Sequence, residues 1–149
     1  MDRRKQIDQF FFALQSINRH VRSGTFEYVQ PVITRVQWLI LRHLHRRGGS
    51  TVGQLAQHLA VRPSTMSQMI DRLEKAKLVR RLVDAIDART RIVKLTEAGV
   101  SIIQQTEARW VEALAEPLAK LTAAEEAQLV ELMTKLAMNL PQRGGESDG

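Results

Sequence analysis

Apolar residues recur at helical spacing over most of the chain, and this periodicity breaks only once. Stripes spaced three and four residues apart predict six helices, over about residues 3–22, 34–45, 51–59, 63–77, 96–121 and 122–139. Residues 79–83 and 91–95 are β-branched and alternate instead, and residues 84–90 between them form an exposed turn. The pattern therefore predicts a mainly α-helical protein with one small β-hairpin.

Local start and stop signals bring two of these helices close together. Thr51 and Gln54 fit a Thr-x-x-Gln capping box, and Pro63 suits the first position of the next helix, where its missing N–H costs nothing. Ala60 and Val61 leave only a short turn between the two helices. They must therefore pack at a steep angle, as in a helix-turn-helix.

The second of these helices has one apolar and one polar face. Its predicted buried stripe consists of Met66, Met69, Ile70, Leu73 and Lys77. The other side carries Ser64, Thr65, Ser67, Gln68, Asp71, Arg72 and Lys75. Short hydroxyls, an amide and cations suit a helix that meets phosphates and base edges. The following hairpin carries cations on both arms and at its tip, which is typical of a wing beside a helix-turn-helix.

Three short segments carry a resemblance to a known family. Residues 87–96 are D-A-R-T-R-I-V-K-L-T, residues 63–67 are P-S-T-M-S, and residues 71–74 are D-R-L-E. The first is similar to the D-x-R-x5-L-T wing sequence of MarR-type transcription regulators, and the others resemble that family's recognition helix. The similarity extends in order from about residue 33 to residue 140. Arg62 departs from it, because the family often places a small capping residue there and arginine caps poorly.

The long outer helices favour pairing of two chains. A monomer would leave much of their apolar surface in water, at about 25 cal/mol per Å². The resemblance implies a homodimer whose two winged helix-turn-helix units contact half-sites about one DNA turn apart in a pseudo-palindromic operator. We therefore expect one compact domain in four parts. These are an N-terminal dimerisation helix and connector (1–32), a DNA-binding unit (33–96), C-terminal dimerisation helices (97–140) and a disordered tail (141–149).

The charge is distributed unevenly along the chain. The formal net charge is +6, but residues 1–49 carry nine Lys/Arg against three Asp/Glu, residues 50–95 nine against four, and residues 96–149 four against nine. Positive charge thus lies with the helix-turn-helix and the segment before it. Such asymmetry indicates an anionic partner for one end of the chain only, and double-stranded DNA is the partner we expect.

Eleven residues are candidate DNA contacts: Thr51, Gln54, Ser64, Thr65, Ser67, Gln68, Arg72, Arg80, Asp87, Arg89 and Arg91. Arg89 at the hairpin tip can enter a narrow minor groove, as the corresponding arginine of the family does, with Asp87 orienting it. Thr51 and Gln54, with the N–H groups of their helix start, could hold a phosphate. Asp71 would be repelled by DNA unless neutralised, so we predict an ion pair with Arg81 or Arg91.

Regulation by a ligand is expected from the resemblance. The family often binds small aromatic acids, and Trp38, Arg42 and Trp110 are candidates for an effector pocket, although core packing is the other interpretation of both tryptophans. A repressor is expected, because an operator-bound dimer blocks polymerase by occupancy alone. The alternative is a winged-helix protein used for nonspecific DNA packaging or protein contact, without an effector.

Other chemistries are disfavoured. The chain lacks cysteine, nucleophile elbows and phosphate-binding glycine loops, so no enzyme activity and no cofactor are expected. His20, His43, His45 and His58 lack metal-ligand spacing, so no metal site is expected. With no apolar run near twenty residues and no signal-peptide pattern, we expect no membrane span and a cytoplasmic location.

Overall fold

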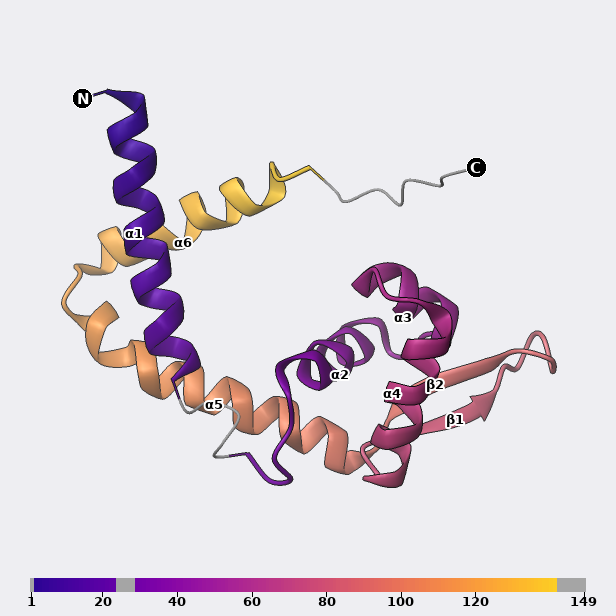
Figure 1. Ribbon diagram of the computed structural model, residues 1–149. Helices are drawn as coiled ribbons and strands as arrows, with labels where there is room; N and C mark the ends of the chain where they lie inside the picture. The colour runs from indigo at the N-terminus through magenta and orange to yellow at the C-terminus, as the bar shows by residue number, and fades with distance from the viewer. Residues whose placement is uncertain (1, 24–28, 142–149) are drawn as a thin grey trace. The chain divides into compact units, whose positions relative to one another are not determined.

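A computed structural model of the chain describes residues 2–23 and 29–141. Its elements are α1 (Arg3–Arg22), α2 (Arg35–Arg47), α3 (Val52–Leu59), α4 (Pro63–Lys75), β1 (Val79–Val83), β2 (Arg91–Leu95), α5 (Glu97–Ala119) and α6 (Ala123–Met138) (Figure 1). The chain divides into two compact units, residues 26–107 and residues 1–25 with 108–149. Among the described helices, none is long and apolar enough to cross a membrane. The predicted tail beyond residue 141 lies outside the described residues.

The unit of residues 26–107 is a winged helix, as the sequence predicts. Strands β1 and β2 pair antiparallel with Val79 opposite Leu95 and Val83 opposite Arg91, and the hairpin extends away from α3 and α4 (Figure 1). Ser50 forms an isolated antiparallel β-bridge with Val93 of β2. Its N–H donates to Val93 O (3.0 Å) and its carbonyl accepts from Val93 N–H (2.7 Å). The base of the wing is thereby joined to the residue that precedes α3.

The core of this unit draws on every one of its helices and on both strands. Its fully buried side chains include Ile40, Leu41, Leu44, Leu55, Met66, Ile70, Leu73, Leu78, Val79, Val93 and Ile102. Burial of each such side chain contributes about 1.5–3 kcal/mol relative to leaving it in water. The wing and the recognition helix therefore share one apolar core and are not independent appendages.

Two burial predictions for this unit are wrong. The sequence predicts Val36 inward and Trp38 and Leu41 on a different side of α2, but Val36 is exposed and the other two are buried. Helix α2 packs against β2 and lies within the unit's core, so more than one of its faces is covered. Lys77 is also predicted to continue the buried stripe of α4, yet it is exposed, because the helix ends at Lys75.

The end of α4 explains the position of Lys77. This residue has a left-handed backbone (φ 62°), and its N–H donates to Glu74 O (2.9 Å) while Leu78 N–H donates to Leu73 O (3.0 Å). These two bonds form a Schellman motif, which satisfies the last carbonyls of a helix and turns the chain sharply. The turn leads directly into β1.

The helix starts follow the local signals closely. Reciprocal capping boxes join Thr34 to Gln37, Thr51 to Gln54 and Thr122 to Glu125, and Thr-x-x-Gln at residues 51–54 and Thr-x-x-Glu at residues 122–125 are the sequence signals for two of them. Pro63 occupies the first turn of α4, where Arg62 is the N-cap and makes no side-chain capping bond. The departure at Arg62 thus leaves this helix start without a side-chain cap among the described residues.

The unit that contains α1 and α6 differs in its burial. Neither of these helices, both fully described, has a buried residue. Their exposed large apolar side chains are Ile7, Phe10, Phe11, Phe12, Ile17, Leu129, Val130, Leu132, Met133, Leu136 and Met138. No residue of the α1 stripe is fully buried in the single chain, although Leu14 and Val21 are half-buried, so the expectation that part of this stripe is core holds only in part.

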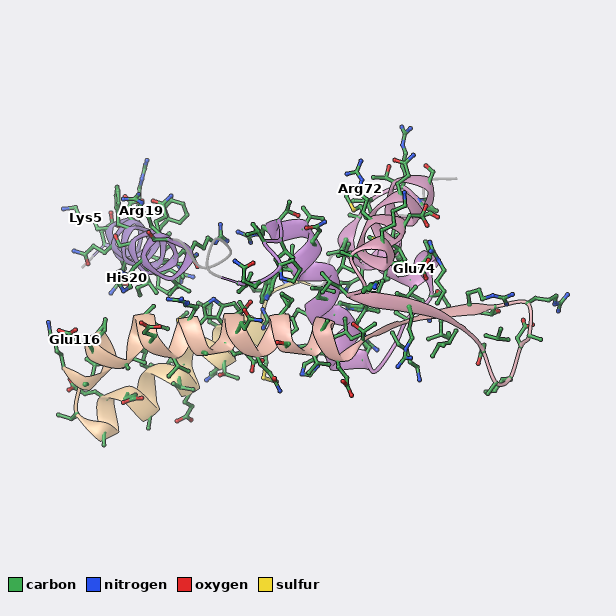
Figure 2. The ribbon with its side chains drawn as sticks, turned by 90° about the horizontal axis from the view of Figure 1, so that it is seen from below. Lys5, Arg19, His20, Arg72, Glu74 and Glu116 are labelled. Atoms are coloured by element: carbon green, nitrogen blue, oxygen red, sulfur yellow. The ribbon has the colours of Figure 1, made fainter. Side chains whose placement is uncertain are left out.

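Proline inside the apolar pattern of α5 predicts a kink or an early end near Ala115, but the helix continues past Pro117 to Ala119. Pro117 has no N–H, so the carbonyl of Ala113, four residues earlier, loses its helical donor. Nε2 of His20, on α1, lies 2.9 Å from that carbonyl oxygen and donates to it instead (Figure 2). A side chain from α1 thus replaces the hydrogen bond that proline removes, and the helix can continue to Ala119.

Candidate nucleic-acid interface

The polar side of α4 lies open to solvent. Ser64, Thr65, Gln68 and Arg72 are exposed, and Ser67 is half-buried. The opposite face of the helix is anchored in the core through Met66, Ile70 and Leu73. The unit therefore presents hydroxyl, amide and guanidinium groups along one accessible helix face, as a helix that enters a major groove requires.

Arg81 on β1 connects the wing to this helix through two carboxylates. Its Nη2 lies 2.7 Å from Asp71 Oδ1 and its Nη1 lies 2.9 Å from Glu74 Oε1. The backbone N–H of Arg81 also donates to Glu74 Oε2 (3.2 Å), and Nη2 reaches Ser67 O at 3.5 Å. The predicted ion pair of Asp71 with Arg81 or Arg91 is confirmed, and Arg81 is the partner. One guanidinium thus pairs with two carboxylates on α4 and holds the wing against this helix.

Glu74 is the partner that the sequence prediction missed. It lies three residues after Asp71, so both carboxylates occupy neighbouring positions on the helix surface, and this spacing is the signal that could have identified it. Arg72 and Glu74 point to different sides of α4 (Figure 2), which leaves Arg72 exposed while Glu74 engages β1. Arg72, which directly follows Asp71 in the sequence, is therefore not the cation that pairs with Asp71 and Glu74; that cation is Arg81.

The tip of the wing is organised by its own side chains. Asp87 Oδ1 accepts from the backbone N–H of Arg89 (3.0 Å), and Asp87 Oδ2 accepts from Thr90 Oγ1 (3.3 Å). The backbone bond from Arg89 is the main cause that lowers the pKa of Asp87 below its ordinary value. Nη1 of Arg91 donates to Ala88 O (3.0 Å). The Arg89 side chain, with Nε 3.5 Å from Asp87 Oδ1, is 94% exposed and projects from this closed turn.

The start of α3 keeps part of its hydrogen-bonding capacity free for a ligand. Gln54 Oε1 accepts from Thr51 N–H (3.0 Å) and from the Ser50 hydroxyl (3.2 Å), while Thr51 Oγ1 accepts from Gln54 N–H (3.1 Å). The amide NH₂ of Gln54 and the O–H of Thr51 remain as donors. Both residues can therefore cap their helix and still donate to an anion.

The hairpin divides the remaining candidates between its two faces. Arg80 pairs with Lys94 across the strands, on the side opposite to Arg81 and Arg91. Both Arg80 and Arg91 are exposed. The structure thus brings Asp87, Arg89 and Arg91 together at the tip, whereas Arg80 lies at the base of the wing on its other face.

The candidate effector residues fall in both units. Trp38 is buried and carries the Arg42 guanidinium 5.1 Å from its ring centroid, within the range of a cation–π contact. Burial lowers the pKa of Arg42, Arg46 adds to this effect, and Glu107 opposes it. Trp110 belongs to the other unit and is half-buried. The effector pocket remains a prediction.

The histidines include one contact that the sequence prediction missed. The rings of His43 on α2 and His58 on α3 lie 4.1 Å apart between centroids and are tilted by 32°. Burial lowers the pKa of His43, and the nearby positive charges of His58 and Arg47 act in the same direction. No group of three potential His, Cys, Asp or Glu ligands occurs in the part of the chain that the structure describes.

Comparisons with known proteins agree with this architecture. The model of a family described as MarR matches residues 33–90, from just before α2 to the wing tip. A mutant MarR from E. coli is 30% identical, with a TM-score of 0.63, over 84% of this chain and 93% of that one. The chain belongs to the MarR family. MarR-family proteins are transcription regulators, so the chain is one as well.

Two further proteins extend the comparison. The uncharacterized HTH-type transcriptional regulator YhbI of Bacillus subtilis is 28% identical over 116 residues, which cover 76% of this chain and 75% of YhbI. RV1404 from Mycobacterium tuberculosis is 25% identical with a TM-score of 0.81 and covers 98% of this chain and 97% of its own. The MarR fold therefore accounts for nearly the whole chain, including the outer helices.

Proposed function

We propose that the chain is a homodimeric, sequence-specific repressor that binds a pseudo-palindromic operator in double-stranded DNA. The observation that carries this proposal is the exposed polar face of α4, joined by Arg81 to a wing whose tip projects Arg89. An operator complex of the mutant E. coli MarR, 29% identical over 95% of this chain and 100% of that one with a TM-score of 0.62, supports duplex DNA as the ligand.

The contacts divide by groove. Ser64, Thr65, Ser67, Gln68 and Arg72 meet base edges and phosphates in the major groove, since they form the polar side of α4. Arg89 enters the adjacent minor groove. The remaining contacts are to phosphate, from Thr51, Gln54, Arg80 and Arg91, while Asp87 holds the tip in shape.

The dimer forms through residues 1–32 and 97–140, and residues 33–96 bind DNA. The uncovered apolar faces of α1 and α6 support this division, because a second copy offers the same faces and each buried Leu, Ile or Phe contributes about 1.5–3 kcal/mol. The charges are complementary as well: Arg3, Arg4 and Lys5 begin α1, whereas Glu125 and Glu126 begin α6.

The proposal also includes repression of transcription and the relief of that repression by a ligand. An operator-bound dimer excludes polymerase by occupancy, and a small aromatic acid relieves it by binding near Arg42 and Trp38. The guanidinium stacked over the Trp38 ring supports this ligand class, because it can pair with a carboxylate while the indole contacts the ligand's ring.

The test combines selection with one matched pair of variants. Bound sequences are selected from random duplex DNA, and the affinity for the selected site is then measured against salt, with and without phenolic acids. Arg89→Ala should weaken binding at least tenfold and reduce the slope of log K against log salt by about one, with unchanged melting. Lys120→Ala removes one positive charge from the turn that follows α5 in the other unit and should bind nearly as the unaltered chain does.

Two outcomes contradict the proposal. Steep salt dependence without any selected sequence favours nonspecific DNA packaging, and no binding to any duplex favours a protein-contact role.

Sedimentation tests the dimer separately: Leu136→Glu on α6 should produce monomers at micromolar concentration, whereas Val83→Glu on the wing, a matched exposed apolar position, should not. A monomeric unaltered chain would exclude the two-fold arrangement.

A further inference from the structure

The tip of the wing carries an apolar side chain that the fold does not use. Ile86 is 96% exposed, the highest value among the large apolar side chains in the described part of the chain. An isoleucine in this position gains no burial from the fold, and its apolar surface remains in water. A polar residue would serve equally well in a turn, so the side chain is available for an external contact.

The turn presents Ile86 on a backbone that is already ordered. Asp84 Oδ1 accepts from the Ile86 N–H (3.2 Å), and Thr90 closes the turn by accepting from Asp84 N–H (3.0 Å) and donating to Asp87 O (3.0 Å). Two alanines, Ala85 and Ala88, complete the tip. The tip is therefore narrow and held by its own hydrogen bonds, so binding does not require ordering it.

Charge alone is a poor explanation for insertion of this tip into DNA. Residues 84–91 contain two carboxylates, Asp84 and Asp87, and two cations, Arg89 and Arg91, so their formal net charge is zero. Both carboxylates accept bonds within the loop, but their charge remains close to any phosphate that the tip approaches. An additional, uncharged contribution is needed if the wing is to add affinity.

We propose that Ile86 enters the minor groove beside Arg89, packs against deoxyribose and favours A·T pairs beneath the wing. This inference rests on the proposed DNA-binding function. The minor groove is about 6 Å wide, its walls are apolar sugar surfaces, and apolar side chains insert there in other DNA-binding proteins. The 2-amino group of guanine occupies the groove floor and obstructs the side chain, whereas A·T pairs leave the floor open.

The experiment uses the full chain and a duplex selected on the unaltered protein. Ile86→Ser should weaken binding about tenfold, equivalent to about 1.4 kcal/mol, without altering the slope of log K against log salt, because no charge is removed. Ile86→Leu should restore most of the affinity. Ala85→Ser, at the neighbouring exposed position, is the matched control and should bind as the unaltered chain does. Melting curves should coincide for all four proteins.

A second arm places the contact in the minor groove. A duplex is made with G·C pairs introduced under the wing, and these are then replaced by inosine·cytosine pairs, which lack the 2-amino group and keep the major-groove edge. This should tighten binding of the unaltered chain severalfold but leave Ile86→Ser unaffected. If Ile86→Ser binds like the unaltered chain, or inosine has the same effect on both, the proposal is overturned while the proposed function stands. If the unaltered chain binds no duplex, both are overturned.

Discussion

Replacing Arg81 with methionine tests how the wing is fixed to the recognition helix. Methionine keeps an apolar stem of similar length but removes the donors that face Asp71 Oδ1 at 2.7 Å and Glu74 Oε1 at 2.9 Å. The backbone bond from residue 81 to Glu74 Oε2 remains available. The substitution therefore isolates the guanidinium from the rest of the strand.

The cost in stability follows from the exposure of the three side chains. A hydrogen bond to a charged group contributes about 1.5–3 kcal/mol when it is well shielded. Here the Arg81 side chain is 23% exposed and the Asp71 and Glu74 side chains are 56% and 42% exposed, so water can solvate both carboxylates after the change. We expect Arg81→Met to lower the unfolding free energy by about 1–2 kcal/mol, which shifts Tm by about 3–6 °C.

The cost in DNA binding has a different origin. With Arg81 present, two carboxylates and one guanidinium leave a single negative charge at this place on α4, and without it there are two. The additional repulsion of phosphate should weaken operator binding about tenfold. Asp71→Asn and Glu74→Gln, introduced together into the Arg81→Met protein, should restore the affinity but not the stability.

The assay is urea unfolding alongside operator titration for the unaltered, single and triple variants. Recovery of binding without recovery of the urea midpoint would separate charge compensation from anchoring. The reasoning is refuted if Arg81→Met leaves both the midpoint and the affinity unchanged. It is refuted also if the triple variant binds no better than Arg81→Met.

Three other predictions concern the close approach at Gly99, the hydrogen bond of His20 and the pKa of His43. Gly99→Ala should cost several kcal/mol in urea unfolding, because the added Cβ would clash with the backbone carbonyl of Leu78; a neutral result would contradict that close approach. Pro117→Ala restores the helical N–H, so His20→Ala should destabilise the Pro117→Ala protein less than it destabilises the unaltered chain, as a double-mutant cycle in urea can measure. The pKa of His43 is lowered in the folded state, so protonation of this residue favours the unfolded chain. The contribution of His43 to stability is therefore full above the unfolded pKa of about 6.5 and falls as the pH drops below that value. His43→Gln should reduce this loss of stability between pH 7.5 and 5.5, as measured by urea unfolding.

Much of the secondary structure is predictable because its causes are local. The capping boxes at Thr51 and Thr122, the proline that begins α4 and the β-branched arms of the hairpin involve residues a few positions apart. The bounds of α1, β1 and β2 coincide with the predicted ones for this reason. The ion pair between Asp71 and Arg81 is also predictable, because a carboxylate on a DNA-facing helix needs a nearby cation.

The remainder depends on contacts between distant segments. Periodicity places Trp38 away from the main stripe of α2, yet packing around that helix buries it. Proline at position 117 predicts a kink or an early helix end, and His20, far away in sequence, lies within hydrogen-bonding distance of the Ala113 carbonyl. The elements and their polar faces therefore follow from the order of the residues, since they depend on short-range geometry. That Glu74 shares Arg81 with Asp71, that His20 reaches Ala113 and that Trp38 is buried depends on how distant segments pack, because hydrogen bonds and burial require atoms to meet in space.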